Sequence, residues 1–98
     1  MDKPYIEKLE REISQLHQCT AHYDTVGWIE EAERNLRWSG FVVAFNLTGH
    51  PKADRCYAWA EGVPENRGGP MLTMLGIPPV VSAETAVRAR LISRLESV

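Results

Sequence analysis

Four side chains between positions 17 and 24 are of types that bind zinc: His17, Cys19, His22 and Asp24. Their spacing fits neither a CxxC pair nor the HExxH helix of zinc proteases. Histidine is also common at the end of a helix, where it meets the negative end of the helix dipole. The spacing therefore favours ordinary residues at a helix end, and we predict no metal site.

A second group of reactive types surrounds a loop that contains glycine and proline. His50, Asp54 and Cys56 could in principle supply a base, an orienting carboxylate and a nucleophile. Cys56, however, falls on the face of a predicted strand that packs into the core, where a thiol is buried and unreactive. We therefore expect the histidine to shape a surface loop and predict no cysteine nucleophile.

A run of carboxylates, Glu30, Glu31 and Glu33, precedes Arg34 and Arg37. Glu30 and Glu33 each stand four residues before an arginine, which is typical of exposed ion pairs on a helix. The chain has no phosphate-binding, dinucleotide-binding or serine-nucleophile motif. No set of residues converges on a reaction, so we predict no catalytic residue and no cofactor, and favour a protein that is not an enzyme.

The first element that could position these groups is a helix from Pro4 to about Cys19. Its apolar residues follow a 3-4-3 spacing that forms one stripe: Ile6, Leu9, Ile13 and Leu16. We favour a stripe that packs on the protein's own sheet. The alternative is a subunit interface, because the same residues also occupy a and d positions of two heptads.

The rest of the chain predicts a second helix, three strands and a last helix. The segments are Thr25 to Trp38 for the helix, Phe41 to Thr48, Arg55 to Glu61 and Met71 to Ile77 for the strands, and Ser82 to Glu96 for the last helix. Short connections make the strands an antiparallel meander. The expected fold is an α+β two-layer sandwich in a single domain, residues 1–98, with two N-terminal helices and one C-terminal helix.

The first strand pair has one apolar face and one mixed face. Symmetric closure of the loop places Thr48 opposite Arg55 and puts Phe45 and Cys56 on the core face. The other face is aromatic and polar and carries Val42, Ala44, Asn46, Thr48, Arg55, Tyr57, Trp59 and Glu61. Such a face is covered by a helix, by a second subunit or by a ligand, and the sequence leaves the three open.

Composition and charge limit the partners. The chain has 98 residues, a net charge of −2 and 44% apolar residues, typical of one globular domain without bulk attraction to nucleic acid. No apolar run is long enough to cross a membrane, and the first residues lack the apolar stretch typical of a signal peptide, so we expect neither. Two cysteines do not make a disulfide framework, so we expect a reducing, cytoplasmic location.

RNA binding is a minor alternative. Helix, three strands and helix is the order of the double-stranded RNA-binding domain, a family in which lysines crowd the start of the last helix. Here those positions are Ser82, Ala83, Glu84 and Thr85, which have the wrong charge for phosphate. The chemistry departs from that family, so we do not expect a nucleic-acid partner.

Two segments carry a resemblance to a group of proteins. Residues 48–59, TGHPKADRCYAW, and residues 76–91, GIPPVVSAETAVRARL, resemble short bacterial proteins of the kind carried on mobile integron gene cassettes. The resemblance covers the second half of the chain and implies a bacterial, cytoplasmic and accessory role. It implies no activity, cofactor or catalytic residue.

Two functions remain open. The favoured one is a binding or interaction protein that acts as a homodimer, through the mixed sheet face (Val42, Asn46, Tyr57, Trp59) or through the stripe of the first helix. The alternative is a small-molecule-binding protein or modest enzyme. Its pocket would lie between sheet and helices, lined by Asn46, Arg55, Tyr57 and Trp59, with Arg55 binding an anion.

Overall fold

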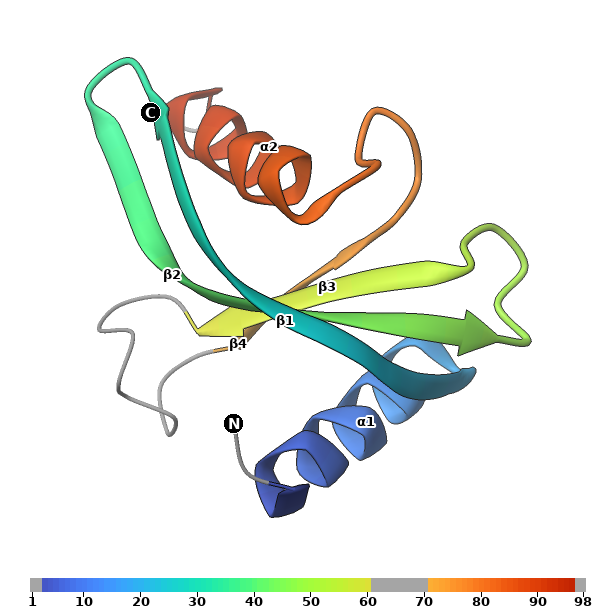
Figure 1. The fold of residues 1–98 in the computed structure, drawn as a ribbon. Helices are drawn as coiled ribbons and strands as arrows, with labels where there is room; N and C mark the ends of the chain where they lie inside the picture. Colours follow the sequence, from blue (N-terminus) through green and yellow to red (C-terminus); the bar gives the residue numbers. More distant parts are fainter. Residues whose placement is uncertain (1–2, 61–70, 97–98) are drawn as a thin grey trace.

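The computed structural model describes residues 3–60 and 71–96 and contains one antiparallel sheet and two helices (Figure 1). The elements follow in the order α1 (Lys3–His17), β1 (Thr20–Glu33), β2 (Leu36–Thr48), β3 (Arg55–Ala60), β4 (Met71–Leu75) and α2 (Ala83–Glu96). The strand order is β1-β2-β3-β4, so each strand lies beside its neighbour in sequence. The α+β class and the antiparallel meander are as predicted, but the described residues form four strands and two helices instead of the predicted three strands and three helices.

Helix α1 covers one face of the sheet, and its stripe packs there as favoured. Ile6, Leu9 and Ile13 are buried against Phe45 and other residues of that face, whereas Leu16 is 65% exposed. Most of the stripe is thus part of the protein's own core. Within the described residues, no helix is both long enough and apolar enough to span a membrane.

Helix α2 covers the opposite face of the sheet. Its buried residues Ala86, Val87 and Leu91 pack against Tyr57 and Trp59. Ser82 caps the helix as expected, because its Oγ accepts a hydrogen bond from Thr85 N at 3.2 Å. The two helices therefore sandwich the sheet, as Figure 1 shows, and the predicted two-layer arrangement is corrected to three layers.

The predicted helix from Thr25 to Trp38 is wrong. This segment forms most of a long hairpin in which β1 turns at Arg34 and Asn35 into β2. Arg34 adopts a positive φ of 55°, which a two-residue hairpin turn requires and which helix interiors do not allow. The helix-like spacing of charges is therefore incidental.

The pairing of β2 with β3 differs from the predicted register by two residues. Asn46, rather than Thr48, lies opposite Arg55, and Phe45 lies opposite Cys56. Because side chains alternate between the two faces with period two, a shift of two residues leaves every side chain on its predicted face. Glu61, the last residue of the predicted strand, and the connection from it to Met71 lie outside the described residues.

Candidate functional site

Three of the five residues predicted for a binding face lie in the core. Val42, Tyr57 and Trp59 are each at most 3% exposed, in the cluster that includes Leu91 of α2. The sequence left open whether a helix, a second subunit or a ligand covers this face, and the structure shows that helix α2 covers it. These side chains are out of reach of a subunit or ligand while α2 is docked.

The other two predicted residues meet at the uncovered end of the same face. Arg55 Nη1 donates hydrogen bonds to Asn46 Oδ1 at 2.8 Å and to Asp24 Oδ2 at 2.9 Å. Its guanidinium carbon lies 5.6 Å from the centre of the Tyr57 ring. Hydrogen bonds to Tyr57 and to Asp24 raise the pKa of Arg55 above its ordinary value. Arg55, which was predicted to bind an anion, thus already forms an ion pair with the carboxylate of Asp24.

The thiol of Cys56 is buried, as predicted. Burial raises its pKa to about 12, so the thiol stays protonated and unreactive near neutral pH. His50 has a different task, because its Nδ1 accepts hydrogen bonds from the backbone N–H groups of Lys52 and Ala53, both at 3.0 Å. The histidine therefore shapes the loop between β2 and β3.

The metal-like residues are not assembled into a site. His17 Nε2 lies 3.0 Å from Thr73 Oγ1, and its ring centre lies 6.3 Å from that of His50, while His22 is exposed. Burial, and secondly the charge of His50, lowers the pKa of His17. In the described part of the chain no three histidine, cysteine or acidic side chains gather as metal ligands would.

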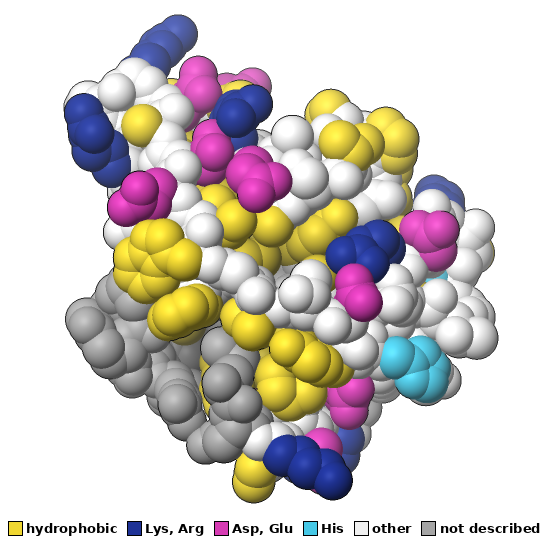
Figure 2. Space-filling model, in the orientation of Figure 1, with side chains coloured by type: hydrophobic (Ala, Val, Ile, Leu, Met, Phe, Trp, Pro, Cys, Tyr) yellow, Lys and Arg dark blue, Asp and Glu magenta, His cyan; other side chains and the backbone are white. Residues whose placement is uncertain are grey.

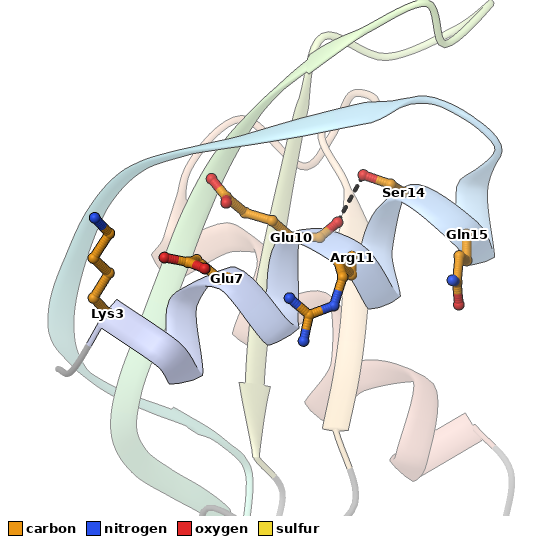
Figure 3. Close-up of a pocket in the computed structure, with 6 residues that line it drawn as sticks. All are labelled: Lys3, Glu7, Glu10, Arg11, Ser14 and Gln15. Carbon is orange, nitrogen blue, oxygen red and sulfur yellow. Dashed lines mark hydrogen bonds between the residues drawn. The ribbon is translucent and has the colours of Figure 1, made fainter.

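A shallow hollow of about 650 Å³ runs along α1 (Figure 3). All of its lining residues come from this helix: Lys3, Glu7, Glu10, Arg11, Ser14 and Gln15. Glu10 Oε2 accepts a hydrogen bond from Tyr23 N at 2.7 Å, and Ser14 Oγ accepts one from Ala21 N at 3.0 Å. The two polar side chains thus satisfy backbone donors on the outer edge of β1, and we assign them a structural role.

An exposed aromatic pair lies on the hairpin formed by β1 and β2. Trp28 and Phe41 are cross-strand neighbours, and each is 49% exposed. Their ring centres are 5.0 Å apart with an interplanar angle of 81°, an edge-to-face contact. Two large aromatic side chains left half in water at adjacent positions are uncommon on a small monomer.

The aromatic pair belongs to a longer exposed strip. From Trp28 toward the turn, every second cross-strand pair of the hairpin places its side chains on the same face as Trp28 and Phe41, and all of these side chains are exposed. We call this set the hairpin surface: Trp28, Glu30, Ala32, Arg37, Ser39 and Phe41. Helix α1 packs farther along this face of the sheet, and α2 packs on the other face. Figure 2 shows hydrophobic atoms on the hairpin below the charged side chains at its tip.

The back of the hairpin is fixed to α2. Arg88 donates two hydrogen bonds to Glu31 Oε1, from Nε at 3.0 Å and from Nη2 at 2.9 Å. The Trp38 ring lies 6.0 Å from the ring of Trp59 in the core beneath the helix. The hairpin surface is therefore presented by a strand pair that is supported from behind.

The sequence predicted a helix from Thr25 to Trp38, which contains Trp28, and this prediction missed the hairpin surface. A signal was present, because the strand-forming types Thr25, Val26, Trp28 and Ile29 stand within five residues. Asn35, close after them, is of a type that favours turns. Together these residues predict a hairpin more directly than the charge spacing predicts a helix.

The sequence matches no protein-family model, and comparisons with curated proteins and with solved structures find no match. Function must therefore be inferred from the geometry of this chain.

Proposed function

We propose that this protein is a non-enzymatic interaction module that acts as a homodimer, with the hairpin surface as its contact. The observation that carries the proposal is the exposed edge-to-face pair of Trp28 and Phe41, on the part of the α1-bearing sheet face that lies beyond the helix. Aromatic side chains are enriched at the centres of protein interfaces, where they bury a large area at a low cost in conformational entropy.

Two further observations support binding rather than catalysis. Cys56 is buried, with a pKa of about 12, and Arg55 is engaged with Asp24 inside the same chain. The groups whose types first suggested chemistry are thus used to build the fold. In the hairpin surface, by contrast, about half of the area of each aromatic side chain contacts no other part of the described chain.

The size of the surface sets the expected affinity. A stable dimer typically buries about 800 Å² on each partner, from about 20 residues, whereas the hairpin surface comprises six side chains. We therefore expect a dimer that depends on concentration, with a dissociation constant of roughly micromolar order.

The test is sedimentation velocity over a concentration range from about 0.1 to 100 μM, which brackets a dissociation constant of this order. We expect the wild type to pass from monomer to dimer and Trp28→Ser to raise the dissociation constant by about 30-fold, the effect of an interface residue worth about 2 kcal/mol.

Leu16→Ser is the matched control, because Leu16 is an exposed apolar side chain on α1, away from the hairpin. It should leave the association unchanged. A wild type that stays monomeric throughout, or a Trp28→Ser variant that dimerises as the wild type does, would contradict the proposal. Circular dichroism should verify that both variants are folded.

A further inference from the structure

We infer that two copies pair hairpin surface to hairpin surface about a two-fold axis parallel to the strands. In this arrangement Trp28 packs on the partner's Phe41, and Glu30 forms an ion pair with the partner's Arg37. The inference rests on the proposed function and specifies the geometry of the same surface.

The hairpin surface consists of three successive cross-strand rows. Trp28 faces Phe41 in the first row, and the next two rows, toward the turn, are Glu30 with Ser39 and Ala32 with Arg37. Rows on one face are separated by two residues, about 7 Å along the strand. Each row has one member on β1 and the other on β2.

The two-fold axis lies between the two facing copies and is parallel to the strands. Rotation about it leaves the position of each row along the strand direction unchanged and places β1 of one copy opposite β2 of the partner. Trp28 of one copy then faces the partner's Phe41, and the reciprocal contact forms by symmetry. The edge-to-face pair within each copy becomes a cluster of four rings at the centre of the contact.

The same axis brings opposite charges together. Glu30 on β1 faces the partner's β2, where Arg37 lies one row farther toward the turn, within reach of a long side chain. Inside one copy, Glu30 and Arg37 lie at diagonal cross-strand positions, yet neither forms an ion pair among the described residues. Both charges are thus available to a second copy.

Charge also favours a second copy over other partners. The hairpin surface carries one acidic and one basic side chain, Glu30 and Arg37, so it is complementary to itself and has no net charge. Nucleic acid and anionic membranes attract surfaces with an excess of positive charge. A self-complementary pattern with apolar rings beside it is typical of a symmetric contact.

The decisive experiment exchanges the charges. Arg37→Glu leaves two acidic residues on each surface, and Glu30→Arg leaves two basic ones, so each variant alone should repel itself and raise the dissociation constant at least about tenfold. An equimolar mixture restores both ion pairs and should form a heterodimer with an affinity close to that of the wild-type dimer. Native mass spectrometry distinguishes the heterodimer by mass.

Lys52→Glu is the matched control for Arg37→Glu, since it makes the same change in net charge but lies on an exposed loop between β2 and β3. It should associate like the wild type. If Trp28→Ser disrupts the wild-type dimer but the mixture associates no better than its components, the inferred pairing is wrong while the proposed function stands. If the wild type is monomeric, both fail.

Discussion

At the scale of the residue, Gly40 determines how the hairpin packs beneath α2. A Cβ atom at this position would lie 2.7 Å from Trp38 Cζ2 and 2.8 Å from Cη2. The six-membered ring of the Trp38 indole therefore lies against the glycine, and the indole is 6.0 Å from the ring of Trp59, measured between ring centres. The absence of a side chain at Gly40 lets two tryptophans share one layer of the core.

We accordingly expect Gly40→Ala to lower the free energy of unfolding by about 1–3 kcal/mol, because the added methyl group must displace the indole from packed surroundings. Urea denaturation measures the change. Gly27→Ala is the control within the same hairpin, since a Cβ there meets nothing within 4 Å, and it should change stability by less than about 1 kcal/mol. Equal losses for the two variants would contradict this packing.

His17 makes stability depend on pH. Its pKa is lowered in the folded protein from the ordinary 6.5 by burial and then by His50, so the unfolded chain binds a proton more readily than the folded one. The contribution of His17 to the free energy of unfolding is fully present above the pKa of the unfolded chain, 6.5. It is lost as the pH falls from 6.5 toward the lower pKa of the folded protein.

We expect the free energy of unfolding to decrease between about pH 7.5 and 5.5, and to decrease less steeply in His17→Gln, which has no titrating ring. The glutamine amide can still hydrogen-bond to Thr73, the present partner of His17 Nε2. Denaturation at a series of pH values gives both curves. Parallel curves for the two proteins would show that His17 does not contribute.

At the scale of the element, patterns of local spacing predicted five of the six described elements. Helix α1, strands β2 to β4 and helix α2 all coincide with predicted elements within a few residues, except that β2 also takes in residues 36–40. Strand β1 was missed because its apolar residues fit a period of 3.6 as well as a period of two. The pairing with β2 across the turn at Arg34 and Asn35 decides between the two interpretations, and the turn-forming type of Asn35 is its local signal.

The ion pair between Glu31 and Arg88 joins β1 to α2 through two residues that are 57 positions apart in the sequence. We expect a double-mutant cycle with Glu31→Ala and Arg88→Ala to give a coupling free energy above zero but below about 1 kcal/mol, because Arg88 remains half exposed. Urea denaturation of the four proteins provides the cycle. A coupling of zero would mean that apolar packing alone holds α2 on the hairpin.

At the scale of the whole molecule, the two helices decide which aromatic side chains meet water. The sequence showed that one sheet face carried Tyr57 and Trp59, but not that α2 would cover it. It also assigned Trp28 to a helix, whereas the structure places it half exposed on strand β1. Alternation along a strand assigns side chains to faces correctly, whereas the choice of the covered face depends on the docking of a distant helix.

The sequential strand order has a consequence for the route of folding. Each strand pairs with its neighbour along the chain, β1 with β2 across a two-residue turn, so the sheet can assemble from local contacts. Docking of α2 on β1, in contrast, closes a long loop. We therefore expect the hairpin to form early and the helix to dock late, so that the aromatic residues beneath α2 remain uncovered until the last step of folding.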